Sequence, residues 1–383
     1  MQADITTEVP SAADHGRPSR ARPEGPGLFE RSRSACVIVA TLVMAAATAA
    51  TLATAEIGFR LLAPQSIVPR YVEAGEHGIR ANIPNVRGMM VTKEFRHAFS
   101  TNAQGFRGTT DYAVDKPDGV YRVIVLGDST TLGHGVSDGE TFSAVAEGLL
   151  NRIRRTEVIN MGVSGFGTAE ELIQLQTVGF RFQPDLVVLA YFPNDPYNNV
   201  VSQLFAMEGR ELVRAGDAFT PALYLRDHLA AIPGYSFLCQ HSHLLNFVRS
   251  RFSAFFMDYL GKKHQSSIDI HPVLSPTEDA LTTSLLREVR RTAVMMQGVP
   301  LVVLNIPVIL DGHPIQNFPE QAFDATDPAV AVIDVERTVY RGHAVSELSY
   351  PNDAHPKPFA HRLIGAALAQ TIQGRFWSGA TAH

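Results

Sequence analysis

One stretch constrains the fold more than any other: residues 121–136 read YRVIVLGDSTTLGHGV. A short apolar run from Val123 to Leu126 ends in a Gly-Asp-Ser sequence, and a helix-like segment begins near Glu140. An order of strand, tight turn and helix lifts the side chain at the apex of the turn above the carboxyl end of a strand, where open α/β sheets carry their sites. That apex is Ser129. A serine there is an effective nucleophile only if the chain also supplies a base and donors for an oxyanion.

Apolar runs recur after this stretch with the length of buried strands. They occupy residues 123–126, 158–161, 186–191, 301–306 and 331–335. Amphipathic helix-like segments lie between or after them, at residues 142–153, 169–178, 281–297 and 361–372. Strands that are apolar throughout and alternate with helices indicate a parallel sheet covered on both faces. We therefore expect an α/β fold, a three-layer α/β/α sandwich around a five-stranded parallel sheet.

The composition is that of a globular chain with a sizeable core. Of the 383 residues, 45% are hydrophobic and 19% are charged, and the net charge is −5. Because the chain has no basic excess, we expect no nucleic acid among its partners. The two cysteines, Cys36 and Cys239, lie far apart in the chain and imply no disulfide framework.

An uncharged segment near the amino terminus is long enough to cross a membrane. Residues 35–55 contain no charged side chain, and a span of roughly 30 Å needs about 20 apolar residues. Five arginines precede the segment and Glu56 follows it, so the basic side is expected to stay in the cytoplasm. We predict a single-pass anchor in the inner membrane, with the remainder facing the periplasm or the exterior. Cleavage as a signal peptide near Ala55 is the alternative, whereas a buried core helix is disfavoured because the segment lacks an amphipathic period.

The chain divides into several predicted parts. Residues 1–33, rich in Pro, Ser, Ala and Arg, are expected to be a disordered cytoplasmic tail, followed by a transmembrane anchor over residues 34–62. A small β-rich lead-in is expected over residues 63–118. The α/β domain then covers residues 119–376, and residues 377–383 are a tail. Within this domain the third and fourth strands are separated by a helical insertion at about 196–277, placed to overhang the site and affect substrate choice.

Three further motifs fall at the edge of the sheet where Ser129 is expected. Gly165 lies in a glycine-rich loop after the second run, where backbone N–H groups can approach a ligand without a Cβ in the way. Asn194 follows the third run, and its amide can donate to an oxyanion. His355 follows Asp353 by two residues, so a carboxylate can fix the tautomer of a histidine base. Each motif also has a structural interpretation, as a β-to-α turn, a helix cap or a surface histidine.

Taken together, these motifs resemble those of the SGNH or GDSL hydrolase superfamily of esterases and lipases. The resemblance implies that Ser129 is the nucleophile, that His355 is its base and that Asp353 orients the histidine. It further implies an oxyanion hole formed by Ser129, Gly165 and Asn194. An Asn-x-x-Gly-Phe-Arg-Gly lead-in and a Gly-Val-x-Gly-Phe-Gly-Thr run are similar to those of a membrane-anchored bacterial subgroup.

The resemblance covers residues 101–369 and departs from the superfamily pattern at one position of the triad. The carboxylate commonly stands three residues before the histidine, where this chain has Asn352. Asp353, two residues before His355, is therefore assigned to the triad. The alternative is a catalytic dyad, in which a backbone carbonyl instead of a carboxylate accepts the hydrogen bond of His355.

The resemblance implies a serine esterase that cleaves carboxylic esters through an acyl-enzyme, without a cofactor or a metal. For an anchored enzyme that faces outward, the expected substrates are O-acetylated or envelope glycans and lipid or short-chain esters. Two other functions remain open: an O-acyltransferase of polysaccharide modification, and a non-catalytic carbohydrate-binding envelope module. His241 and His243 are two residues apart with no acidic neighbour and are not expected to bind metal.

Overall fold

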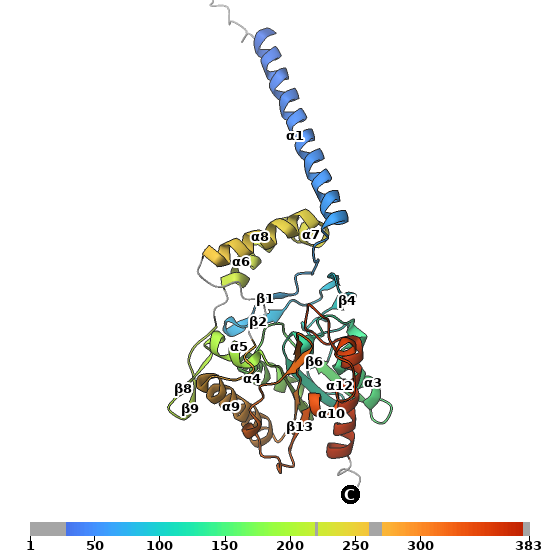
Figure 1. The fold of residues 1–383 in the computed structure, drawn as a ribbon, viewed down its shortest axis with the longest axis vertical. Helices are drawn as coiled ribbons and strands as arrows, with labels where there is room; N and C mark the ends of the chain where they lie inside the picture. Colours follow the sequence, from blue (N-terminus) through green and yellow to red (C-terminus); the bar gives the residue numbers. More distant parts are fainter. Residues whose placement is uncertain (1–27, 219–220, 260–269, 378–383) are drawn as a thin grey trace, which may run out of the picture. The chain divides into compact units, whose positions relative to one another are not determined.

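The structure is a computed structural model and describes residues 28–218, 221–259 and 270–377 (Figure 1). Most of the predicted cytoplasmic tail and nearly all of the carboxyl-terminal tail lie outside the described residues. The chain divides into two compact units after Ile57.

One helix, α1 (Leu28–Leu62), is long and apolar enough to cross a membrane. Its candidate span covers residues 33–62, and none of its most apolar window is buried within the protein. A signal sequence near an amino terminus has the same length and composition, so the helix fits both alternatives given above.

A five-stranded sheet, in the order β13-β10-β7-β5-β6, forms the centre of the second unit. Its strands are β5 (Tyr121–Gly127), β6 (Thr156–Asn160), β7 (Leu186–Tyr191), β10 (Leu301–Asn305) and β13 (Val330–Asp334). All four pairings are parallel. Every residue of β5, β7 and β10 is buried, which explains why these runs are apolar throughout. The predicted five-stranded parallel sheet is confirmed.

The order of the strands reverses beside β5, the first of the five in the chain. Its neighbours are the second strand, β6, on one side and the third strand, β7, on the other. In open α/β sheets, ligands bind outside the carboxyl ends of the strands at such a switch point. Residues that directly follow β5 and β7 are therefore placed where a site is expected.

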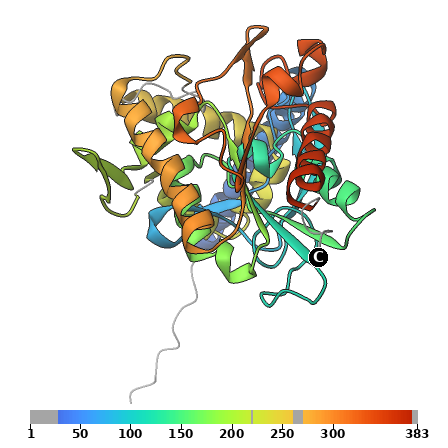
Figure 2. The same ribbon diagram turned by 90° about the horizontal axis from the view of Figure 1, so that it is seen from below.

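Helices cover both faces of this sheet and complete the three predicted layers (Figure 2). Alternate residues of β5 point to opposite sides, since Val123 and Val125 join one core cluster and Ile124 and Leu126 join the other. The first cluster is closed by α3 (Phe142–Leu150) and α12 (Pro358–Thr371), which pack against each other. The second is closed by α4 (Thr168–Thr177) and α9 (Pro276–Arg290), with α5 (Asp195–Ser202) packed beside them.

The segment before the sheet forms two antiparallel strand pairs. They are β1 (Val72–Ala74) with β2 (Arg80–Asn82), and β3 (Arg87–Val91) with β4 (Arg96–Ser100). Met90, Phe95 and Phe99 from this segment form a small buried cluster with Leu132, which lies three residues after Ser129. The lead-in segment thus packs directly against the turn that carries the candidate nucleophile.

The long stretch between β7 and β10 contains both helices and a β-hairpin. Its further elements are the strands β8 (Phe205–Glu208) and β9 (Glu211–Arg214) and the helices α6 (Pro221–Ala230), α7 (Tyr235–His241) and α8 (His243–Tyr259). The sequence analysis predicts only helices here, because the alternation that marks the hairpin extends over just four residues on each side. Residues 219–220 and 260–269 of this stretch lie outside the described part of the chain.

Candidate active site

The turn after β5 presents Ser129 at the carboxyl edge of the sheet. Gly127 closes the strand, and a Cβ there would lie 2.0 Å from Oγ1 of Thr131, so a larger residue does not fit this turn. Helix α2 (Ser129–Leu132) begins at once, with the carboxylate of Asp128 accepting from the backbone N–H of Thr130 at 2.7 Å. Because Ser129 is the first helical residue, its N–H has no acceptor within the helix and is available to a ligand.

Three of the predicted residues are brought together in one hydrogen-bonded row. The Oγ atom of Ser129 lies 2.9 Å from Nε2 of His355, and Nδ1 of the same ring lies 2.5 Å from Oδ1 of Asp353. Ala354 between them has a φ of 63°, a left-handed conformation that is strained for alanine and folds the two side chains back on each other. Nδ1 also lies 3.2 Å from the carbonyl oxygen of Asp353, so the closer partner of the imidazole is the carboxylate.

Asn352, where the superfamily commonly has its carboxylate, faces a different partner. Its backbone N–H and its Nδ2 both donate to the carboxylate of Glu94 in the lead-in segment, at 3.2 and 3.1 Å. The shorter spacing from Asp353 to His355 is therefore the one that places a carboxylate on the imidazole.

The charge on Asp353 fixes the tautomer of His355. Burial opposes ionisation of this carboxyl, but its contacts with His134 and His355 outweigh burial and hold its pKa well below the usual range. An ionised carboxylate can only accept, so Nδ1 of His355 must carry the proton that it donates. Nε2 then presents its lone pair to the hydroxyl of Ser129, as a general base requires.

Asn194 contacts the serine turn, and Gly165 lies in a loop whose Val163 N–H donates to the Gly127 carbonyl of that turn at 3.0 Å. Nδ2 of the buried Asn194 donates to Oδ2 of Asp128 at 3.2 Å, which leaves its second amide hydrogen for a ligand. Gly165 has a φ of 80°, and a Cβ there would lie 2.6 Å from a guanidinium nitrogen of Arg80. That guanidinium donates to the Gly165 carbonyl at 2.6 Å, so the lead-in segment also fixes the glycine loop.

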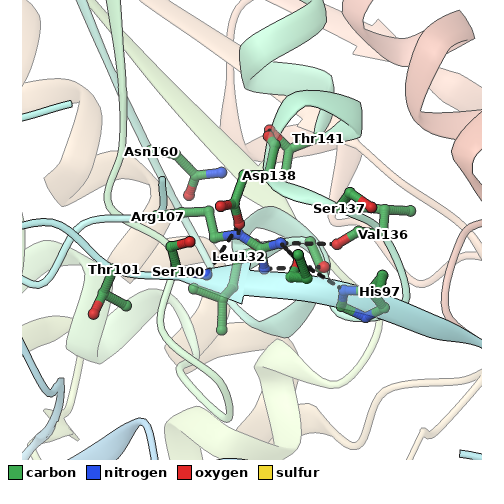
Figure 3. Close-up of polar contacts among 12 residues, drawn as sticks. His97, Ser100, Thr101, Arg107, Leu132, Val136, Ser137, Asp138, Thr141 and Asn160 are labelled. Atoms are coloured by element: carbon green, nitrogen blue, oxygen red, sulfur yellow. Dashed lines mark hydrogen bonds and ion pairs between the residues drawn. The ribbon is translucent and has the colours of Figure 1, made fainter. Parts of the chain in front are cut away.

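Arg107 orders the loop that follows helix α2 (Figure 3). Its side chain is 1% exposed and forms an ion pair of 2.8 Å with Asp138. Its guanidinium also donates to the carbonyls of Leu132, Gly133 and Val136, at 3.0, 3.3 and 2.8 Å. Arg107 belongs to the Asn-x-x-Gly-Phe-Arg-Gly motif, but its role could not be predicted from the sequence, because its acceptors in this loop are backbone carbonyls that every residue type has.

His134 is a residue of the site that the sequence analysis does not single out. Its Nε2 lies 3.6 Å from Oδ2 of Asp353, and its ring centroid lies 4.5 Å from that of His355. Among the described residues, these three offer ligand atoms within 4.8 Å of one another and so could hold a metal ion. The available signal was its position, five residues after Ser129 in the same motif.

Buried carboxyl groups lie behind the site at the starts of α4 and α5. Glu171 is fully buried, and neither of its carboxyl oxygens has a hydrogen-bond partner among the described residues. Burial raises its pKa well above the ordinary value, as it does for Asp195, and each carboxyl raises the pKa of the other. Burial also raises the pKa of Glu170 to about 7. The fold therefore favours the protonated form of carboxyl groups whose ordinary pKa values are 3.8 for Asp195 and 4.5 for the two glutamates.

These raised pKa values make stability depend on pH. A carboxyl whose pKa is higher in the folded chain contributes stability that is complete below the unfolded pKa and is lost as pH rises through the folded pKa. For Glu170 that interval runs from 4.5 to about 7. In the wild type, the free energy of unfolding should fall by about 3 kcal/mol across this interval. Glu170→Gln should abolish that fall, since glutamine does not titrate but keeps an acceptor for the N–H of Gly167. Urea denaturation at a series of pH values measures the change in slope.

Glu211→Gln on the exposed hairpin is the matched control and should keep the wild-type pH slope. An unchanged slope in Glu170→Gln would mean that the Glu170 carboxyl titrates alike in the folded and unfolded chains.

No protein-family model and no curated protein matches the chain. Similar solved structures include a two-domain esterase active on acetylated mannans, at 11% identity and a TM-score of 0.37, over 66% of this chain and 49% of that one. They also include a putative lipolytic protein of the G-D-S-L family from Desulfitobacterium hafniense DCB-2, at 11% identity and a TM-score of 0.36, over 65% and 98% of the two chains. A third is a lipase/acylhydrolase from Enterococcus faecalis, at 15% identity and a TM-score of 0.33, over 67% and 96%.

The chain thus spans about half the length of the two-domain esterase and nearly the whole of the other two proteins. All three are described as esterases, lipases or lipolytic proteins, the class that the four motifs resemble. Their identities and TM-scores are low, so the functional case rests on the contacts of the site itself.

Proposed function

We propose that the protein is a serine esterase of the SGNH type that cleaves carboxylic esters. The observation that carries the proposal is the row formed by Ser129, His355 and Asp353, with contacts of 2.9 and 2.5 Å. A serine hydroxyl, a histidine and an ionised carboxylate in this order are the nucleophile, base and orienting group of acyl transfer. Their place at the switch point of the sheet supports a site rather than a packing cluster.

In the proposed reaction, Nε2 of His355 removes the hydroxyl proton of Ser129 as Oγ attacks the ester carbonyl carbon. The carbonyl π electrons move to oxygen, and this oxyanion accepts from the N–H groups of Ser129 and Gly165 and from the amide of Asn194. When the tetrahedral intermediate collapses, the imidazolium gives its proton to the departing alcohol. Water, deprotonated by the same histidine, then attacks the acyl-serine. The imidazolium returns its proton to Oγ of Ser129 as the acyl–oxygen bond breaks, which releases the acid and the free enzyme.

The location of the site suggests the class of substrate. Helix α1 is proposed to anchor the chain in the inner membrane, with the α/β domain on the periplasmic side. Esters available there include O-acetyl groups on envelope or extracellular glycans, and short-chain or lipid esters. One similar structure is an esterase active on acetylated mannans, which agrees with an acetylated glycan as substrate.

Covalent labelling with a fluorophosphonate tests the proposal before a substrate is known. The full-length protein in detergent should gain the mass of one probe less HF, because an activated serine loses its proton, attacks the phosphorus and displaces fluoride. Ser129→Ala should gain none. Ser164→Ala is the matched control. The hydroxyl of Ser164, in the glycine loop, is hydrogen-bonded to that of Tyr71 at 2.9 Å, and this variant should still form the adduct. An adduct that persists in Ser129→Ala, or a folded wild type that forms none, would overturn the assignment.

A further inference from the structure

The side chain of His134 has no part in the acyl-transfer steps, yet it completes a set of metal-binding atoms. Its Nε2 lies 3.6 Å from a carboxylate oxygen of Asp353, whose other oxygen lies 2.5 Å from Nδ1 of His355. Two imidazoles and a carboxylate are a common ligand set of Zn²⁺, which leaves a fourth position for water. Ligand atoms about 2.1 Å from a tetrahedral ion stand roughly 3.4 Å apart, close to the separation of Nε2 and Oδ2.

The fold holds His134 in this place rather than leaving it on a free loop. Its backbone N–H donates to the Ser129 carbonyl at 2.9 Å, and its ring packs edge-on against Phe95, with centroids 5.3 Å apart. The guanidinium of Arg107 donates to the carbonyl of Gly133, the residue before His134, and to that of Val136, two residues after it, which Figure 3 shows. A ligand fixed in this way loses little conformational freedom on binding a metal, which favours affinity.

The three side chains are also accessible from solvent. Those of His134, Asp353 and His355 are 16%, 23% and 12% exposed. A hydrated ion can therefore reach the ligand atoms, while the carboxylate supplies the negative charge that two neutral imidazoles lack.

We propose that His134, Asp353 and His355 form a Zn²⁺ site whose occupancy switches off the esterase. The inhibitory effect rests on the proposed function, whereas the metal site itself does not. Nδ1 and Oδ1 are 2.5 Å apart, about 0.9 Å less than two ligands of one tetrahedral ion, so binding opens the hydrogen bond between His355 and Asp353. The ion then occupies the lone pair of Nδ1. A neutral imidazole that binds metal through Nδ1 carries its one proton on Nε2. Nε2 then has no lone pair for the Ser129 hydroxyl, and the serine is not activated.

The ligand set also defines which cations act. Imidazole nitrogens suit Zn²⁺ and its neighbours in the first transition series, whereas Mg²⁺ and Ca²⁺ prefer oxygen ligands. Zn²⁺ should therefore inhibit the esterase, whereas Mg²⁺ at the same concentration should not. A chelator should restore activity, because no covalent bond of the protein is changed.

Calorimetric titration of the full-length, untagged protein with ZnCl₂ tests the site without a substrate. Wild type should bind one ion, and His134→Gln, which keeps an amide facing Asp353, should bind at least about 100-fold more weakly, since loss of even an outer-shell partner costs 10- to 100-fold. His343→Gln removes an exposed histidine elsewhere and should bind as wild type does. Equal affinity in wild type and His134→Gln, or no binding by wild type, would refute the site.

The rate of fluorophosphonate labelling is the second readout. Zn²⁺ should slow labelling of the wild type, and a chelator should restore the original rate. His134→Gln should be labelled at the same rate with and without the ion. Binding of Zn²⁺ with unchanged labelling would refute the proposed inhibition and leave the metal site standing. If neither wild type nor His134→Gln were labelled in the absence of metal, the result would instead count against the esterase assignment.

Discussion

Substituting His355→Ala is expected to lower kcat for ester hydrolysis by about 10⁶-fold, and Asp353→Asn by about 10⁴-fold. The first change removes the proposed base, whose Nε2 lies 2.9 Å from the Ser129 hydroxyl oxygen. The second keeps the shape of the side chain but allows its amide to donate to Nδ1, which moves the imidazole proton to Nε2 and gives the wrong tautomer. The two losses should not add in the double variant, because the residues act as one unit. Burst and steady-state kinetics with a chromogenic acetate ester measure both.

Asn352→Ala is the control that separates the two spacings of the carboxylate. Its amide binds Glu94 rather than His355, so kcat should stay within a few-fold of wild type. If Asp353→Asn kept full activity, His355 would depend on the carbonyl of residue 353, and the site would be a dyad. Asn352→Ala should also keep the wild-type melting temperature, since its side chain is exposed and contributes little to the core.

Most of the fold and part of the site could be predicted from local sequence. The run at residues 186–191 coincides with β7, because a strand buried on both faces must be apolar at every position. Ser129 and Asn194 could be placed for a related reason. Each follows the end of a strand by only a few residues, and parallel strands bring their carboxyl ends to a common edge.

The roles of Arg107 and His134 could not be predicted, because they depend on contacts between distant segments. The sequence places Arg107 in the Asn-x-x-Gly-Phe-Arg-Gly motif but does not show its partners, which are Asp138 and carbonyl groups of residues 132–136. His134 gains its role from Asp353, which lies far along the chain and is folded back by the conformation of Ala354. Such contacts follow from tertiary packing of the lead-in and the last loop, not from periodicity.

Arg107→Met should be the most destabilising single change in the site, lowering the free energy of unfolding by about 3 to 5 kcal/mol. Methionine fills much of the volume but leaves Asp138 without its guanidinium partner, and it removes the donor to the carbonyls of Leu132 and Val136. It also removes the cation that lies 4.4 Å from the centre of the Phe99 ring. Urea denaturation at neutral pH, followed by near-ultraviolet circular dichroism, measures the loss.

Two variants show whether this loss comes from the buried network. Arg337→Met removes an arginine whose side chain is 70% exposed in its ion pair with Glu320, and it should lower the free energy of unfolding by less than about 1 kcal/mol.

Arg107→Lys keeps the charge, but a lysine ammonium lacks the planar guanidinium group that reaches several carbonyls at once. This variant should therefore recover only part of the lost stability. If Arg107→Met proved no more destabilising than Arg337→Met, the loop at residues 132–136 would be held by the packing of Leu132 against the lead-in segment. In that case, fluorophosphonate should label Ser129 at the wild-type rate in Arg107→Met. If instead the Arg107 network holds the loop, labelling should be slower in this variant, because the loop begins three residues after Ser129.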